Sequence, residues 1–327
     1  MDVATLEGAS ETAANTRVFF DGIRINADSL TDPRWDRVLP IFEEAQIFMC
    51  RQMSTLLDGL AKGALVLDVG TGSGVFAIWA AKRGYRIVGV DINPRAILMA
   101  HKNAVDNDVK VYDSPDKLAE GGICLKLKRF DEVFAADKTF MSKFDYVLLN
   151  PPYNPTCPGV MPALHAESGR DGQRCFDEQI ALVPQVLTPQ GWCVGIQLTV
   201  SNEAEVEAFR KLKESFGEGC AIRYTHILDK KYYPTREFLQ RQYESYLKGG
   251  KTSGPSGLTV ENYIEEISKA NSHFAFIYYE ICKGIHDQPR GSLMELRRVF
   301  VPQRGWDDRI HLHRQIVDYI APSARAR

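Results

Sequence analysis

Apolar runs that alternate with helical segments predict an α/β fold, built on a doubly wound parallel sheet of seven strands. The runs LVLDVG at 65–70 and YRIVGVD at 85–91 are short and apolar, as is typical of buried parallel strands. A glycine-rich turn follows the first run directly and opens a helical segment. An N-terminal helical arm and a helical insertion between the last two strands complete the expected fold.

The N-terminal half is expected to begin with a polar lead-in, followed by a helix over 31–58, where apolar residues recur at helical spacing after Asp32-Pro33. Gly84 is expected to close the first helix of the sheet domain, and Pro94 to occupy the first turn of the second. The predicted elements are strands at 65–70, 85–91, 132–137 (EVFAAD) and 146–150, with helices at 75–84 and 94–105.

The C-terminal half is expected to hold helices at 175–186 and 202–216, with strands at 191–199, 221–228 and 273–281. Residues 229–272 lie where this fold needs only a hairpin, and they contain two helical stretches joined by KGGKTSGPSG. A surface insertion is one interpretation; a substrate cap is favoured, because loops at the rim of such sheets often carry specificity. The domains are then an arm at 1–60, a core at 61–228 and 273–284, the insertion at 229–272, and a C-terminal extension at 285–327.

Composition argues for a soluble, cytoplasmic protein without a membrane partner. Forty basic and forty-two acidic residues give a net charge of −2, which disfavours a nucleic-acid partner. Seven scattered cysteines, never in a C-x-x-C pair, indicate reduced thiols and neither disulfides nor a zinc site. His311 and His313 are interpreted as surface residues, so no metal is expected. The oligomeric state is left open.

The segment DVGTGSG at 68–74 predicts a site for an adenosine-containing cofactor. Gly70, Gly72 and Gly74 leave the backbone bare where a ligand must approach, and the following helix offers free amides at its N-terminus. Asp91 ends the next strand, where a carboxylate accepts hydrogen bonds from ribose hydroxyls. A nicotinamide site would need glycine at position 75, which is valine here, so an oxidoreductase is the weaker alternative.

The D-x-G-x-G-x-G form that begins at Asp68 resembles the first motif of class I S-adenosylmethionine-dependent methyltransferases, which have a Rossmann-like sheet. The resemblance implies that the turn, with Thr71, holds the methionine part of S-adenosyl-L-methionine. It also implies that Asp91, with Ile92 beside it, holds the ribose end. By the same resemblance Asp137, at the tip of the third expected strand, accepts a hydrogen bond from the adenine amine.

The sequence NPPY, at Asn150 to Tyr153, ends the fourth expected strand with two rigid prolines and a phenol. A planar nitrogen is a poor nucleophile, because its lone pair is delocalised. The Asn150 side-chain oxygen and the Pro151 carbonyl would accept hydrogen bonds from the N–H groups of this nitrogen. Pro151 and Pro152 restrict the direction of that carbonyl. Tyr153 would stack on the planar group. A turn without chemistry is the alternative reading.

NPPY followed by SGRDG at 168–172 and LTPQG at 187–191 resembles the HemK-like protein glutamine methyltransferases over about residues 64–200. The resemblance implies N-methylation and leaves the acceptor open. A small molecule or free amino acid with an arginine-like guanidine ranks first, since Glu167, Asp171, Asp177 and Glu178 would neutralise a cation. A protein glutamine ranks second and an amino group on an RNA or DNA base third. A non-catalytic cofactor-binding module is the competing class.

Overall fold

The sequence folds around parallel strands in two compact units, each described by itself. The computed structural model describes residues 15–29, 32–41, 46, 48–57, 62–132, 140–160, 164–202, 205–217, 220–227, 232–244, 247, 258–283, 293–295, 299–302 and 316–319. The first unit comprises 1–150, 182–195 and 282–284, and the second comprises 151–181, 196–281 and 285–327. The chain therefore leaves the first unit between Asn150 and Pro151.

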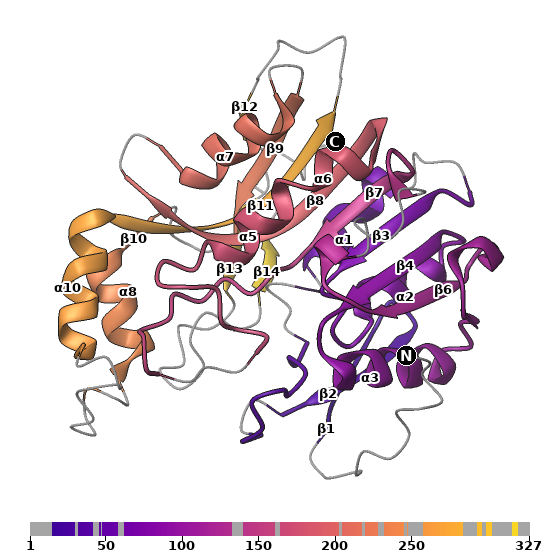
Figure 1. Ribbon diagram of the computed structural model, residues 1–327, viewed down its shortest axis with the longest axis horizontal. Helices are drawn as coiled ribbons and strands as arrows, with labels where there is room; N and C mark the ends of the chain where they lie inside the picture. Colours follow the sequence, from indigo (N-terminus) through magenta and orange to yellow (C-terminus); the bar gives the residue numbers. More distant parts are fainter. Residues whose placement is uncertain are drawn as a thin grey trace. The chain divides into compact units, whose positions relative to one another are not determined.

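The first unit carries the glycine-rich turn on a parallel sheet, in which β3 lies between β4 and β7 (Figure 1). Its strand order is β5-β6-β4-β3-β7-β8. The apolar residues of β3 and β4 other than Leu65 are buried, as expected for strands covered on both faces. The sheet elements are β3 (Leu65–Val69), α2 (Val75–Ala81), β4 (Arg86–Asp91), α3 (Pro94–Asp106), β5 (Val111–Tyr112), η3 (Pro115–Lys117), β6 (Ile123–Leu127), β7 (Phe144–Leu149), α6 (Val183–Val186) and the first part of β8 (Leu187–Ser201).

The helices of this unit follow their sequence signals. All seven residues of α2 are buried, in agreement with its uniformly apolar sequence VFAIWAA. The Asn93 side chain caps α3 by accepting from the Arg95 amide, with Pro94 in the first turn as predicted. Helix α2 follows the glycine-rich turn directly, since Gly74 is its N-cap residue.

The N-terminal arm differs from the expected helix. Strands β1 (Asn15–Phe20) and β2 (Ile23–Asp28) form an antiparallel hairpin, and the predicted helix over 31–58 is confirmed only for α1 (Phe48–Leu57). Residues 32–41 are not helical. The reason is tertiary: the buried Asp28 carboxylate pairs with Arg34 and Arg95 and accepts from the Val38 amide, which holds this segment as a loop.

The strand expected at 132–137 lies mostly outside the described residues, and another segment pairs with β4. The strand beside β4 is β6, and Glu132 of the expected strand EVFAAD lies in a helical turn. Residues Ala136, Asp137 and Lys138 lie outside the described part of the chain. The residues ICL of β6 are buried beside β4.

The second unit contains the remainder of β8, with β11 and β9 next in strand order and β12 beyond β9. Predicted strands at 191–199, 221–228 and 273–281 are confirmed with shifted ends, and the predicted helix over 175–186 is interrupted at Ala181 and Leu182, before Pro184. Its elements are α5 (Arg174–Ile180), α7 (Glu207–Phe216), β9 (Cys220–His226), β10 (Tyr233–Pro234), α8 (Thr235–Gln242), α10 (Val260–Ala270), β11 (His273–Lys283), β12 (Leu293–Glu295), β13 (Val299–Pro302) and β14 (Ile316–Tyr319).

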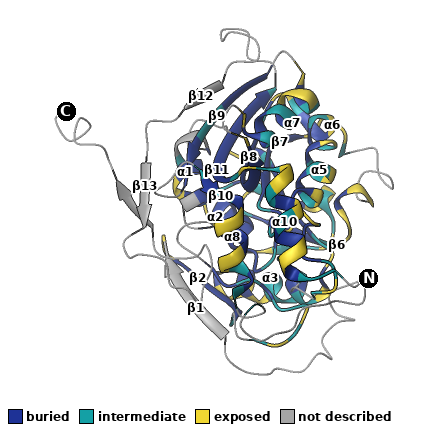
Figure 2. Cartoon of the chain, turned by 90° about the vertical axis from the view of Figure 1, so that its left-hand side faces the viewer, coloured by how far each residue is buried: buried dark blue, intermediate teal, exposed yellow. Residues whose placement is uncertain are grey.

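The expected helical insertion is present as α8 and α10. Both helices bury one face and expose the other (Figure 2), and Thr259 caps the N-terminus of α10, where its hydroxyl accepts from the Asn262 amide. The glycine-rich linker between them lies outside the described residues, as do His311 and His313. No helix within the described ranges has the length and apolar character needed to cross a membrane.

Candidate active site

The glycine-rich turn lies at the carboxyl end of β3 and bends around the end of β4. The amides of Gly70 and Thr71 both donate to the Val90 carbonyl, at 2.9 and 3.0 Å. Gly70, Gly72 and Gly74 all have positive φ, and a Cβ on Gly70 would meet nothing within 4 Å. At Gly74, by contrast, a Cβ would lie 3.0 Å from the Ala100 Cβ. The turn therefore needs glycine for backbone shape at Gly70 and for close packing on α3 at Gly74.

Asp91 is oriented by the turn itself. Its Oδ2 accepts from the Gly72 amide and its Oδ1 from the Asn93 amide, each at 2.9 Å. Burial raises the pKa of this carboxyl, and the two amide hydrogen bonds act against that rise. Each carboxylate oxygen keeps a further lone pair, so the side chain is able to accept hydrogen bonds from a pair of hydroxyl groups.

Asp68 lies beneath the turn, out of contact with solvent. Its carboxylate accepts from the Thr71 hydroxyl at 2.7 Å. Burial raises the pKa of Asp68 to about 7, the Thr71 hydrogen bond opposes the rise, and the Asp91 charge adds to it. Asp68 thus supports the turn from within.

Asn103 on α3 links the N-terminal hairpin to the glycine-rich turn. This fully buried amide donates to the carbonyls of Asn26 and Ser73, each at 2.8 Å, and accepts from the Asn26 amide and side chain, each at 3.0 Å. Sequence reasoning missed Asn103, because a lone asparagine inside a helix has no signature of its own. Its only signal was its place on the helix that packs against the turn.

The loop that follows the hairpin is tied to the start of α3. The Asn93 side chain donates to the Asp36 carbonyl at 2.7 Å, while Asp91 holds the Asn93 amide. The neighbouring side chains Trp35 and Ile92 are 62% and 51% exposed and are the most exposed large apolar side chains of the loop and the strand end. Trp35 and Ile92 are thus exposed apolar side chains, each next in sequence to a residue of the Asp36–Asn93 hydrogen bond.

Asn150 ends β7 at the same edge of the sheet as the turn. Val69 pairs with Val90 on one side and with Leu149 on the other, so the next residues, Asp91, Gly70 and Asn150, follow one another across the carboxyl ends of three adjacent strands. The Asn150 side-chain oxygen is shielded from solvent and finds no hydrogen-bond donor among the described residues. A shielded, unsatisfied acceptor is costly and is usually retained for a ligand or water.

In the second unit, the residues after Asn150 form the proline loop, 151–157. This loop runs beside 166–169: the Asn154 amide donates to the Ala166 carbonyl at 3.1 Å and the Thr156 amide to the Gly169 carbonyl at 2.8 Å. The Tyr153 ring is largely buried and packs at a tilt on Phe276, with centroids 5.3 Å apart. The loop is a defined structure, and Tyr153 is part of its packing.

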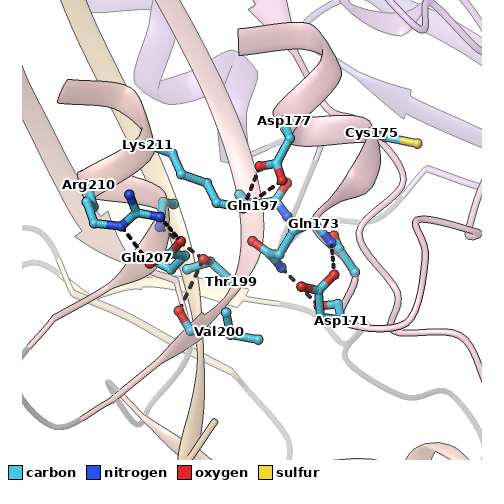
Figure 3. A network of polar contacts seen from close by, with 12 residues as sticks. Asp171, Gln173, Cys175, Asp177, Gln197, Thr199, Val200, Glu207, Arg210 and Lys211 are labelled. Carbon is cyan, nitrogen blue, oxygen red and sulfur yellow. Dashed lines mark hydrogen bonds and ion pairs between the residues drawn. The ribbon is translucent and has the colours of Figure 1, made fainter. Parts of the chain in front are cut away.

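Gly172 of the SGRDG segment packs closely against the backbone of the proline loop. A Cβ at this position would lie 2.3 Å from the Tyr153 carbonyl oxygen, and the φ of Gly172 is +78°. Two buried glutamines continue the support (Figure 3): Gln197 donates to the Gly172 carbonyl at 3.2 Å, and both Gln197 and Gln173 donate to the Leu198 carbonyl. The backbone of the loop and the strand β8 are therefore joined through buried amides.

The acidic residues downstream of NPPY already have partners within the protein. Glu167 pairs with Arg174 and accepts from the Gly169 amide. Asp171 accepts from the Gln173 amide, and Asp177 pairs with Lys211 at 2.6 Å (Figure 3). Glu178 also has a partner.

The structure brings some predicted site residues together and leaves others apart. Asp68, Thr71, the three turn glycines, Asp91 and Asn150 meet at one edge of the first unit. Pro151, Pro152 and Tyr153 belong to the second unit, and Asp137 lies outside the described residues. The proposed adenine contact of Asp137 therefore stays a prediction, and the described strand beside β4 is β6, which ends at Leu127.

The cluster in the first unit has the groups that S-adenosyl-L-methionine requires. The open space beside Gly70 allows a ligand to approach the backbone, and Asp91 offers acceptors for a ribose diol. The exposed apolar side chains of Trp35 and Ile92 are suited to a purine ring. These residues fit the cofactor.

Comparison with known proteins gives the same class. Residues 41–151 match the family described as a methyltransferase domain. A candidate protein N5-glutamine methyltransferase from Methanocaldococcus jannaschii is 32% identical over 166 residues, which are 49% of this chain and 73% of that protein. A release factor glutamine methyltransferase from Geobacter sulfurreducens is 32% identical over 140 residues, which are 39% of this chain and 43% of that protein.

Among solved structures, the SAM-dependent methyltransferase from Agrobacterium tumefaciens aligns with 84% of this chain and 72% of its own, at a TM-score of 0.49 and 14% identity. The fold, the site at the carboxyl ends of β3 and β4, and the sequence match define a methyltransferase. The chain belongs to the S-adenosyl-L-methionine-dependent methyltransferase family.

Proposed function

We propose that the protein transfers a methyl group to a neutral planar nitrogen, with the side-chain amide of a protein glutamine as the first candidate acceptor. The observation that carries the proposal is the buried Asn150 oxygen, which has no hydrogen-bond donor among the described residues and lies one strand away from Gly70 at the edge where Asp91 also lies. An oxygen at this place is suited to accept a hydrogen bond from an N–H group of the substrate. The two relatives with glutamine methyltransferase names support the same acceptor.

The charges near the proline loop favour a neutral acceptor over a guanidinium. Glu167 and Asp177 are paired with Arg174 and Lys211, and Asp171 holds a backbone amide. A guanidinium stays protonated unless a free carboxylate takes its proton. Because these carboxylates are already engaged, a neutral amide now ranks above the arginine-like acceptor.

The chemistry assigned to the chain is orientation. The bound cofactor supplies an electrophilic methyl group on a sulfonium sulfur. We assign Asn150 Oδ1 and the Pro151 carbonyl to accept hydrogen bonds from the two N–H groups of the substrate amide. These bonds would direct the nitrogen lone pair to the methyl carbon. Held at the glycine-rich turn and Asp91, the cofactor would supply the methyl group and would keep the C–S electron pair, while the methylated nitrogen would lose one N–H proton to water. Tyr153 is assigned to line the site of the planar group.

The test is methyl transfer to defined probes. Purified protein is incubated with tritiated S-adenosylmethionine and, separately, with a glutamine-containing peptide, free glutamine, free arginine, total tRNA and a size-fractionated cell extract. We expect label in the peptide or in the protein fraction of the extract. Label only in small molecules, or only in tRNA, would replace the glutamine assignment by one of the other two acceptor classes.

Asn150→Ala tests the residue assignment, with Asn262→Ala on the exposed face of α10 as the matched control. We expect the Asn150 variant to lose about 100-fold or more in turnover, since it removes an orienting contact. Its affinity for S-adenosylhomocysteine, measured by calorimetry, should stay within a few-fold of wild type. Wild-type turnover in Asn150→Ala would contradict the role, and cofactor binding without transfer to any probe would support a non-catalytic binding module.

A further inference from the structure

The helical insertion contacts the proline loop through the end of α8. Tyr243, which follows the last residue of α8, is buried, and its hydroxyl makes two hydrogen bonds to the loop. It accepts from the Cys157 amide and donates to the Pro155 carbonyl, each at 2.8 Å. One hydroxyl group thus bridges the two sides of a three-residue segment.

Two neighbouring contacts hold the same region. The Gln242 side chain donates to the Pro155 carbonyl at 2.8 Å. On α10, the hydroxyl of the fully buried Tyr263 donates to the carbonyl of Arg170, at 2.6 Å, within the SGRDG segment that supports the loop. The Tyr243 and Tyr263 rings meet edge to face, with centroids 5.7 Å apart, so the two contacts belong to one packed cluster.

The loop depends on these donors and acceptors because of its sequence. Prolines have no amide hydrogen, so few backbone groups of NPPYNPTC can join a ladder. The Cys157 residue is 1% exposed, and the Tyr243 hydroxyl is the acceptor of its amide. A buried amide without an acceptor is strongly unfavourable, so the loop keeps this shape while Tyr243 is in place.

Charged contacts at the periphery contribute less. Arg170 pairs with Glu266, and Arg236 of α8 pairs with Glu265 of α10. All four side chains are well exposed to solvent, so their ion pairs are screened. Among the described residues, the buried tyrosine hydroxyls and the Gln242 side chain are therefore the contacts that join the insertion to the loop and its support.

We propose that α8 and α10 form a fixed wall for the acceptor site, and that Tyr243 is a positioning residue that sets the shape of the proline loop. The inference rests on the proposed function, because it assigns the loop to the methyl acceptor. A movable lid would have to break the buried contacts of Tyr243 and Tyr263 at each opening. A fixed wall keeps them, and it makes the insertion a determinant of which acceptor enters.

The test is Tyr243→Phe, which removes the hydroxyl and keeps the ring. Hydrogen–deuterium exchange of the peptide containing Cys157 is measured in the free protein. Affinity for S-adenosylhomocysteine is measured as well, with kcat and KM for the probe that takes up label from tritiated S-adenosylmethionine. We expect exchange at the Cys157 amide to become about tenfold faster or more, and kcat to fall about tenfold with a smaller change in KM. Affinity for S-adenosylhomocysteine should stay within about twofold.

Ser268→Ala is the matched control, since it removes a hydroxyl from α10 that has no partner among the described residues. It should leave exchange and kcat unchanged. Unchanged exchange at Cys157 in Tyr243→Phe, or an equal loss of kcat in Ser268→Ala, would overturn the inference. If Tyr243→Phe does not fold, Gln242→Ala tests the second contact to Pro155 and should raise loop exchange in the same direction.

The two proposals fail in different ways. Absence of transfer by the wild-type protein to every probe would reject the proposed function. Slow exchange of the loop in Tyr243→Phe would reject the fixed wall, whatever the acceptor proves to be.

Discussion

The Asn103 side chain donates a 2.8 Å hydrogen bond to the Ser73 carbonyl, which joins α3 to the glycine-rich turn. The same amide satisfies both backbone groups of Asn26 in the hairpin. Three segments that are far apart in sequence thus share one buried side chain. The turn and the arm are therefore coupled, and we expect changes in the arm to alter the affinity of the turn for the cofactor.

Replacement of Asn103 should test this coupling. Asn103→Leu leaves the Asn26 amide and the Ser73 carbonyl without their partner, at a cost of about 2–4 kcal/mol in unfolding free energy. We expect affinity for S-adenosylhomocysteine to fall about tenfold as well, measured by calorimetry beside a urea melt. Val105→Ala on the exposed side of α3 is the control and should change neither. Full cofactor affinity in Asn103→Leu would contradict the coupling.

Trp35 should report cofactor binding by its fluorescence. It is 62% exposed on the loop that is hydrogen-bonded to the residues beside Asp91, so we expect the adenine ring to cover it together with Ile92. Titration with S-adenosylhomocysteine should quench tryptophan emission, and Trp35→Phe should abolish most of that change. Trp35→Ala should weaken binding about tenfold, the usual range for loss of one base-stacking contact. Trp192→Phe serves as the control that keeps the signal, and an unchanged quench in Trp35→Phe would refute the prediction.

Asp68 should make stability depend on pH near neutrality. Its pKa is about 7 in the folded protein and 3.8 as the ordinary value, so between these pH values the folded state holds a proton that the unfolded state has lost. Unfolding free energy should therefore fall as pH rises from about 4 to about 7, by at most about 1.4 kcal/mol per pH unit. Asp68→Asn cannot titrate and should flatten this dependence. The measurement is urea unfolding across that range, and parallel curves for the two proteins would rule out the effect.

Gly172 should tolerate no side chain. In Gly172→Ala the new Cβ would lie 2.3 Å from the Tyr153 carbonyl, so the loop must shift in addition to the cost of positive φ. We expect a loss of about 3 kcal/mol or more in stability and the loss of methyl transfer, with cofactor affinity retained. Gly22→Ala is the matched control: its φ is +74° and nothing lies within 4 Å of the added Cβ, so it should cost only about 1–2 kcal/mol. Equal effects of the two variants would contradict the proposed close contact.

Sequence periodicity predicted most of the sheet, because each strand is a short apolar run whose burial does not depend on its neighbours' identity. The strands β3, β4 and β7 and the helices α2 and α3 lie where they were predicted, to within a few residues. The insertion at 229–272 was predicted because this segment is much longer than a hairpin and contains two helical stretches. The helix predicted over 31–58 was wrong at residues 32–41, where the ion pair of Asp28 with the distant Arg95 accompanies a loop. The strand predicted at 132–137 is described only at Glu132, and the strand beside β4 is β6.

The glycine turn, Asp91 and Asn150 were predictable because their spacing along parallel strands brings them to one edge. Their supporting residues were not. Asn103, Gln197 and Tyr243 are ordinary polar residues in sequence, and their partners lie 30, 25 and 86 positions away.

By itself, the sequence determined the α/β class, the cofactor family and the residues that end the central strands, because glycine conformation, proline geometry and hydrophobic alternation act over a few neighbouring residues. Only the tertiary structure decided that Glu167 and Asp177 after NPPY are already paired, and that the helical insertion holds the proline loop. Those features depend on which polar groups meet when the chain is buried, since a hydrogen bond between distant segments leaves no pattern in either segment alone.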